Sequence, residues 1–278
     1  MKKISRRSFM AAAAVSVAAL AMTACGGSAS SAASSVASSA ASSEAVSSAA
    51  AAELTTVEAG KLTMATNATF PPYEMTTDSG EIEGIDVDTA KAIAEKLGLE
   101  LQIDDMDFDA ALLSVQQGKA DIVMAGVTVT DERKAVMDFS DSYATGIQSI
   151  IVPNDSDIAS PDDLAGKKIG TQRGTTGYIY CSDDFGEDSV VAYDNGLTAV
   201  QALNNGQVDA VVIDNAPATE YVAANPGLKV LDTSYAEEDY AIGMAKGSAL
   251  EDAVNKALEE LKADGTLQAI VDKYINAN

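Results

Sequence analysis

The feature that most constrains the fold is an alternation of short apolar segments with amphipathic segments that begins near Lys61. In the first half, strands are predicted at 62–66, 99–103 and 121–125, and helices at 86–97 and 109–117. Gly98 and Gly118 directly follow the two predicted helices, as is common at helix ends. The polar residues 130–133 can cap a further helix.

The second half of the chain repeats this alternation. It predicts strands at 168–171, 190–193 and 208–213, a helix that opens at 174–176, a helix at 197–203, and two C-terminal helices within 248–275. Strands that alternate with helices predict an α/β fold with mixed, mostly parallel sheets flanked by helices. Because the two halves are similar, we expect two lobes. Ligands of open α/β sheets bind beyond the carboxyl ends of the strands.

The first 53 residues have a different composition. Residues 1–24 combine a basic start with a short apolar stretch and small residues, which predicts a signal peptide. The residues before Cys25 resemble a bacterial lipobox, in which the cysteine is lipidated and becomes the mature N-terminus. Residues 25–53 would then be a lipidated cysteine followed by a disordered Ser/Ala linker. The alternative is an uncleaved membrane anchor. The two adjacent arginines at 6–7 leave both Sec and twin-arginine export open.

Composition excludes several classes of function. The chain has 42 acidic and 18 basic residues and a net charge of −24, so it repels phosphate backbones and nucleic-acid binding is not expected. It has no histidine, which excludes Ser-His-Asp and Cys-His catalysis and imidazole metal ligands. If Cys25 is lipidated, Cys181 has no partner within the chain. We therefore expect no disulfide, no metal and no cofactor.

Eight short motifs carry a family resemblance. They are 70–74 (FPPYE), 84–88 (GIDVD), 126–133 (GVTVTDER), 139–141 (FSD), 164–167 (LAGK), 174–176 (GTT), 208–214 (VDAVVID) and 261–266 (LKADGT). Together, and in this order, they resemble extracellular solute-binding protein family 3, the amino-acid receptors of ABC importers. Thr89 departs from the apolar residue that is usual in the family after the second motif.

The resemblance implies a two-lobed clamp of the periplasmic-binding-protein-like type II fold. Lobe 1 would comprise 54–145 plus 240–278 and lobe 2 would comprise 146–239, with two hinge strands between them. The ligand would bind between the lobes, and the closed form would dock on an ABC transporter permease. The protein would be a monomer, lipid-anchored at the extracytoplasmic face of a bacterial cell membrane.

An α-amino acid is a zwitterion, so its site needs a cation and an anion. Arg133 is the candidate for the carboxylate, because its planar guanidinium matches a carboxylate with two hydrogen bonds. Backbone amides after Gly126, chiefly that of Thr128, and donors from Thr175 and Thr176 at a helix N-terminus would assist it. The alternative for Arg133 is a surface ion pair with an acid at 131 or 138.

Asp214 is the candidate for the ammonium group, because it ends a very apolar strand where a carboxylate is costly unless it is paired. The alternative is an N-cap for a helix at 215–224, and both roles can hold together. The resemblance places Phe70 and Phe108 over the ligand side chain, although a single Phe is more often part of a core.

Asn67 and Gln172 are candidate specificity residues. Family receptors for cationic amino acids often have an acid at the position of Asn67, so this neutral residue favours a polar or neutral ligand. The roles of Arg173 and Cys181 stay open.

Two other functions compete with this hypothesis. Cyclohexadienyl dehydratases resemble these receptors, but the lack of histidine and the Arg133/Asp214 pair favour binding without catalysis. A ligand-sensing module would continue into an output domain, which we do not expect from a chain ending at residue 278.

Overall fold

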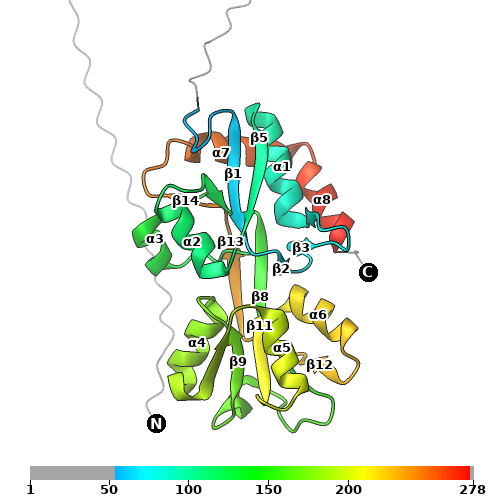
Figure 1. The fold of residues 1–278 in the computed structure, drawn as a ribbon. Coiled ribbons are helices and arrows are strands. Elements are labelled where there is room, and N and C mark those ends of the chain that lie inside the picture. The colour runs from blue at the N-terminus through cyan, green and yellow to red at the C-terminus, as the bar shows by residue number, and fades with distance from the viewer. Residues whose placement is uncertain (1–53, 276–278) are drawn as a thin grey trace, which may run out of the picture. The chain divides into compact units, whose positions relative to one another are not determined.

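The computed structural model describes residues 54–275. The predicted signal peptide, Cys25 and the linker up to residue 53 therefore lie outside the described residues. The described chain has two main β-sheets, each with helices packed on it (Figure 1). None of the helices in this part of the chain is long and apolar enough to cross a membrane.

The first main sheet has the strand order β5-β1-β6-β14-β7. Its strands are β1 (Lys61–Thr66), β5 (Glu100–Asp105), β6 (Ile122–Val123), β7 (Met137–Phe139) and β14 (Gly243–Ala245). The pairings of β1 with β5 and β6 are parallel, and those of β14 with β6 and β7 are antiparallel. A C-terminal strand thus completes a sheet begun by the N-terminal part.

Helices cover both faces of this sheet. They are α1 (Ile85–Leu97), α2 (Phe108–Gln116), α3 (Asp131–Val136), α7 (Glu251–Ala263) and α8 (Thr266–Tyr274). Leu62 and Met64 of β1 belong to the core cluster formed with α1, α7 and α8, whereas Ala65 belongs to the cluster formed with α2. Alternate residues of a strand point to opposite faces, so β1 contributes to both cores.

A small antiparallel sheet precedes α1. It consists of β2 (Thr69–Phe70), β3 (Glu74–Thr76) and β4 (Ile82–Glu83). This sheet carries the first family-like motif, and it brings Phe70 and Glu74 opposite each other in register.

The second main sheet has the order β10-β9-β11-β8-β12, with β13 also paired to β8. Its strands are β8 (Ala144–Pro153), β9 (Ile169–Gln172), β10 (Val190–Tyr193), β11 (Ala210–Asp214), β12 (Leu228–Val230) and β13 (Ala236–Tyr240). The helices are η1 (Pro161–Leu164), α4 (Thr176–Phe185), η2 (Glu187–Ser189), α5 (Gly196–Asn204) and α6 (Asn215–Ala224). The pairings of β9 with β10 and β11 are parallel, and those of β8 are antiparallel.

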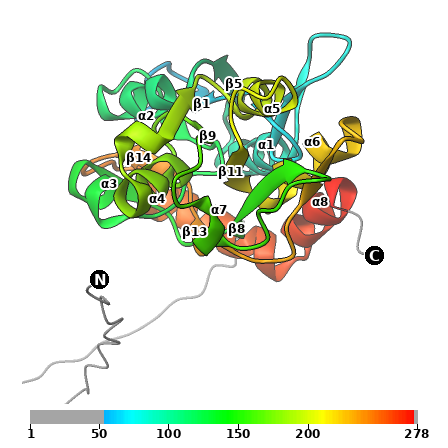
Figure 2. The ribbon, with the colours of Figure 1, turned by 90° about the horizontal axis from the view of Figure 1, so that it is seen from below.

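Two strands connect the lobes that form around these sheets. The chain passes from the first lobe to the second in β8 and returns in β13, and Figures 1 and 2 both show the two strands side by side. Their antiparallel register runs from Gln148 opposite Ala236 to Ala144 opposite Tyr240. The predicted lobe boundaries fall inside this strand pair and stay a prediction.

The expected α/β fold with mixed sheets is confirmed, and so is every helix that the sequence predicts. Antiparallel pairings have a larger share than expected, because β8 and β14 join sheets that otherwise follow the parallel βαβ pattern. Predicted strand ends differ by a few residues: β5 begins at Glu100, β6 covers only Ile122–Val123, and β11 begins at Ala210.

Candidate ligand-binding site

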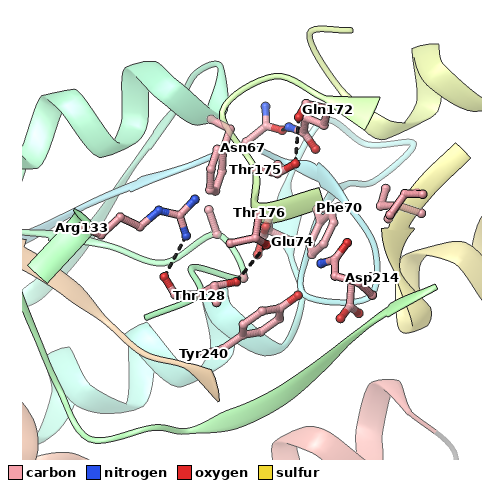
Figure 3. A pocket seen from close by; sticks show the side chains of 16 residues that line it. Asn67, Phe70, Glu74, Thr128, Arg133, Gln172, Thr175, Thr176, Asp214 and Tyr240 are labelled. Atoms are coloured by element: carbon pink, nitrogen blue, oxygen red, sulfur yellow. Dashed lines mark hydrogen bonds between the residues drawn. The ribbon is translucent and has the colours of Figure 1, made fainter. Parts of the chain in front are cut away.

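One pocket lies between the two lobes and is lined by both (Figure 3). About 440 Å³ of space not filled by protein atoms lies in it and at its mouth, open solvent included. All ten predicted site residues line it: Asn67, Phe70, Phe108, Gly126, Thr128, Arg133, Gln172, Thr175, Thr176 and Asp214. Their roles in binding stay a prediction, but the structure brings all of them to one place.

The ends of parallel strands position several of these side chains. Asn67 directly follows β1, while Gln172 and Asp214 are the last residues of β9 and β11. Thr175 caps the N-terminus of α4, where its hydroxyl accepts a hydrogen bond from the amide of Tyr178 (3.3 Å). The pocket therefore lies where open α/β sheets bind their ligands.

Arg133 is held in the pocket wall by both lobes. Its Nη1 donates to the carbonyl oxygen of Thr128 (2.8 Å), and its Nη2 donates to that of Gly174 in the second lobe (3.1 Å). The guanidinium carbon lies 5.4 Å from the centre of the Phe108 ring, a cation–π geometry. Burial lowers the pKa of Arg133, and the charge of Glu238 opposes this effect.

The surface alternative for Arg133 is wrong, because its side chain is buried. Among the described residues it has no ion pair with Asp131 or Asp138, and Asp138 instead pairs with Lys246 (2.5 Å). Arg133 is therefore a buried cation that faces the pocket.

Asp214 is buried at the opposite wall. Its Oδ2 accepts from the amide of Ile147 in β8 (2.7 Å), and its Oδ1 accepts from that of Ala216 in the first turn of α6 (3.1 Å). The predicted N-cap role is therefore confirmed, and the same carboxylate also lines the pocket. Burial raises the pKa of Asp214 to about 6, although both backbone hydrogen bonds lower it.

The two phenylalanines occupy different walls. Phe108 lies under the Arg133 guanidinium, and Phe70 stacks on Tyr73 with ring centres 5.8 Å apart. Gly126 has a φ of 56°, and a Cβ at this position would lie 2.8 Å from Cε1 of Phe70. Because Gly126 has no side chain, the Phe70 ring can approach the backbone at this wall.

Asn67 and Gln172 contact each other across the pocket. Nε2 of Gln172 donates to Oδ1 of Asn67 (3.0 Å), and Nδ2 of Asn67 donates to the carbonyl oxygen of Met106 (2.9 Å). The two candidate specificity residues therefore join the lobes in addition to lining the pocket.

Arg173 and Cys181 are not among the lining residues. The Arg173 side chain is 53% exposed and lies 3.8 Å from the carboxylate of Asp194. Cys181 is fully buried, and burial raises the pKa of its thiol to about 12, which leaves it unreactive at neutral pH.

Several pocket residues were not anticipated from the sequence: Glu74, Ala125, Gln148, Val212, Ile213 and Tyr240. Glu74 ends the first family-like motif, but a Glu near two prolines gives no sign that it is buried. Gln148 and Tyr240 lie on the connecting strands β8 and β13, whose pairing only the tertiary structure defines.

Behind this wall lies a buried acidic cluster. Asp86 at the start of α1 accepts hydrogen bonds from the hydroxyl of Tyr143 (2.7 Å) and the amide of Gly126 (3.0 Å). Burial raises the pKa of Asp86 to about 6. Glu74 is also fully buried, and burial, followed by the charge of Asp86, holds its pKa well above the usual range.

A buried pocket between two lobes, with a cation from one lobe and a carboxylate from the other, defines a two-lobed receptor for a small solute. The model of the bacterial extracellular solute-binding proteins, family 3, matches residues 62–277. The chain belongs to this family.

Individual relatives agree with this assignment. The chain is 33% identical over 225 residues to the L-cystine-binding protein TcyJ of Escherichia coli K12, covering 80% of this chain and 85% of the relative. It is 34% identical over 272 residues to a probable histidine-binding protein of Neisseria gonorrhoeae, and the match covers 95% of this chain and 94% of the relative. Among solved structures, the arginine-, lysine-, histidine-binding protein ArtJ of Geobacillus stearothermophilus superposes with a TM-score of 0.75 at 35% identity. The superposition covers 78% of this chain and 96% of ArtJ.

Proposed function

We propose that this chain is an extracytoplasmic receptor that binds a free α-amino acid between its lobes and delivers it to the permease of an ABC importer. The observation that carries the proposal is the placement of Arg133 and Asp214 on opposite walls of one buried pocket. A zwitterion needs a cation and an anion in the same site, and most other small solutes need at most one of them. The names of the relatives support an amino-acid ligand, since they include cystine, histidine, lysine and arginine.

In this proposal each predicted site residue has a defined task. Arg133 binds the ligand carboxylate, assisted by Thr128 and by hydroxyl and amide donors of Thr175 and Thr176 at the N-terminus of α4. Asp214 binds the ammonium group. The other wall residues, which are Asn67, Phe70, Phe108, Gly126 and Gln172, enclose the side chain of the ligand.

A thermal-shift screen of the twenty amino acids, cystine and polyamines on the purified protein tests the proposal. A ligand at 100 times its dissociation constant stabilises the folded state by about 2.7 kcal/mol, which is a visible shift of the melting temperature. If no amino acid raises the melting temperature and calorimetry detects no heat of binding, the proposal is wrong.

We propose binding without catalysis. The named relatives are binding proteins, and the polar groups of the pocket are arranged to hold a zwitterion. Incubation with prephenate or arogenate should give no product. Turnover of either compound would instead identify a cyclohexadienyl-dehydratase-like enzyme.

We further propose that the protein is a monomer held at the membrane by a lipid on Cys25. The basic n-region, the short apolar stretch and the small residues before Cys25 support this. Cys25→Ser should move the protein from the membrane fraction to the soluble fraction, and Cys181→Ser, which removes the other thiol, should leave it in the membrane fraction. A Cys25→Ser protein that still sediments with membranes contradicts the lipid anchor.

A further inference from the structure

The connecting strand β13, which returns the chain to the first lobe, carries two buried polar side chains. Exposed and buried residues alternate along it, and Glu238 and Tyr240 are both buried, so their side chains point to the same face. Tyr240 lines the pocket, and its hydroxyl hydrogen-bonds to Asp214. Glu238 is not among the lining residues, so its burial must serve something other than direct contact with a ligand.

The carboxylate of Glu238 accepts hydrogen bonds from separate parts of the chain. Its Oε2 accepts from the hydroxyl of Thr128 in the first lobe (3.1 Å) and from Nε2 of Gln148 in β8 (3.0 Å). The hydroxyl of Tyr180, in α4 of the second lobe, also hydrogen-bonds to this side chain. A buried acid that stabilised a single lobe would find its donors in that lobe, whereas Glu238 takes them from both lobes and from a connecting strand.

The donors on the side of the second lobe lie at the boundary between the lobes. Tyr180 lines a groove that α4 forms with residues 129–132 of the first lobe. A Cβ on Gly177, in the first turn of α4, would lie 2.9 Å from Oε1 of Gln148. The start of α4 therefore packs directly on the side chain that donates to Glu238.

On the side of the first lobe, Thr128 links Glu238 to Arg133. The hydroxyl of Thr128 donates to Glu238, while its carbonyl oxygen accepts from Nη1 of Arg133. The amide of Val129 also donates to the carbonyl oxygen of Asp239 in β13 (3.0 Å). The negative charge of Glu238 favours the charged form of Arg133. Glu238 thus supports the carboxylate-binding wall of the pocket from behind.

These hydrogen bonds depend on the position of the lobes. Because β8 and β13 connect the lobes, bending of this strand pair moves Thr128 relative to Tyr180 (Figure 1). The donors can then no longer share one carboxylate, and water takes their place in the opened cleft. Hydrogen bonds to an ionised group are stronger than those between neutral groups, so their loss opposes opening.

We infer that Glu238 is a positioning residue that holds the two lobes in the closed arrangement, and so sets how long a bound amino acid is retained. This role rests on the proposed function of the same pocket. Glu238 acts through Thr128, Gln148 and Tyr180 and does not touch the ligand. Loss of its carboxylate should therefore speed the release of an amino acid far more than it slows the binding.

The variant Glu238→Gln tests the residue, because glutamine has nearly the same shape, keeps only one acceptor oxygen and turns an NH₂ group toward the donors. The probes are L-arginine, L-histidine and L-cystine, which occur in the names of the relatives. Dissociation of a bound probe should become about 10-fold faster or more, the effect expected when a hydrogen bond to a charged group is lost. Association should change little.

Stopped-flow measurement of tyrosine fluorescence gives both rates, since the chain has nine tyrosines and no tryptophan. Glu237→Gln, the same substitution at the exposed neighbouring position, should change neither rate. An unaltered dissociation rate in Glu238→Gln, or an effect on association alone, would overturn the inference and leave the proposed function intact. Any other amino acid that the thermal-shift screen identifies replaces the probes, and if none binds, the proposed function itself fails.

A second variant tests the link to the second lobe. Tyr180→Phe should also speed dissociation, and it should add little in a protein that already carries Glu238→Gln, because the hydroxyl and the carboxylate act on each other. Tyr178→Phe, on the same helix, is the matched control and should leave the rate unaltered. Fully independent effects of Tyr180→Phe and Glu238→Gln would overturn the inference.

Melting temperatures without a probe separate this role from a purely structural one. Each lobe keeps its own core when the lobes part, so ligand-free Glu238→Gln should melt close to the unaltered protein, and the difference should appear when a probe is bound. A variant that melts much lower without a probe, yet releases the probe at the unaltered rate, has lost a structural contact only, and this result would contradict the inference.

Discussion

Arg133 and Asp214 each combine a structural and a binding role. The two backbone carbonyls that accept from Arg133 fix the direction of its guanidinium, and the two amides that donate to Asp214 fix its carboxylate. Both side chains are therefore oriented before a ligand arrives, which reduces the entropy that binding must overcome. Because the two side chains lie on opposite walls of the pocket, we expect them to contact different groups of the ligand.

Arg133→Ala should weaken amino-acid binding by about 3 kcal/mol or more, roughly 100-fold, because the ligand carboxylate is then buried without a cation. Calorimetry measures the affinity, and the melting temperature of the ligand-free variant shows whether it is folded. Arg173→Ala removes the exposed arginine outside the pocket and serves as the matched control. Affinity retained by a folded Arg133→Ala protein would contradict the site.

Ligand affinity should fall as the pH falls below about 6. The pKa of Asp214 is raised to about 6 in the ligand-free protein, and a bound ammonium group favours the carboxylate and lowers this pKa. Between the two pKa values binding releases a proton, so the association constant decreases by up to about tenfold for each pH unit. The dissociation constant at pH 5 should be about ten times that at pH 7, and a constant value between these pH values would be inconsistent with ionised Asp214 as the partner.

At the scale of elements, the β8–β13 pair connects the lobes and also forms part of the pocket. Tyr240 at the end of β13 is buried, lines the pocket and packs edge-on against Tyr73, with ring centres 5.4 Å apart. Its hydroxyl lowers the pKa of Asp214. Its ring lies directly over Gly146 of β8, so the close approach of the two strands depends on a residue without a side chain.

Gly146→Ala should therefore destabilise the protein by about 1–3 kcal/mol, the usual cost of overpacking, and weaken ligand binding. A Cβ at this position would lie 2.5 Å from Cζ of Tyr240, so the ring or the strand must move. Gly227→Ala is the control, because nothing lies within 4 Å of its Cβ. Thermal melts with and without ligand measure both effects. Equal melting temperatures of the Gly146→Ala and Gly227→Ala variants in both conditions would show that Tyr240 is free to shift.

At the scale of the whole molecule, the structure shows the lobes in contact across the pocket. Hydrogen bonds that cross from one lobe to the other include those of Gln172 to Asn67, Arg133 to Gly174, Thr128 with Thr176, and Tyr221 to Thr69. These contacts lie beside the pocket, so we expect them to separate when a ligand enters or leaves. Flexing of the two connecting strands allows this without disturbing either core.

Small-angle X-ray scattering should thus show a larger radius of gyration without ligand than with a saturating ligand. The bound form should match the closed arrangement, since the ligand adds contacts to both lobes only when they meet. Gln172→Ala removes one of the crossing hydrogen bonds, and it should lower the affinity by about 1 kcal/mol, the usual value of such a bond. An identical radius in both states would contradict a clamp that closes on its ligand.

The sequence by itself determined the fold class, the family and ten residues of the pocket wall. Periodic apolar residues specify helices and strands locally, and the carboxyl ends of parallel strands gather at one edge of a sheet, which indicated the fold class and the strand-end residues. The family and the aromatic residues of the site followed from the resemblance of eight short motifs. Arg133 and Asp214 were found in this way, from a motif and from a strand end.

Only the tertiary structure decided which other groups face the ligand. Glu74 and Tyr240 are far apart in the chain, and neither has a local pattern that shows its burial. Packing of the two lobes brings Asn67 and Gln172 together. The set of groups that line the pocket follows from these long-range contacts, which no local pattern in the sequence records.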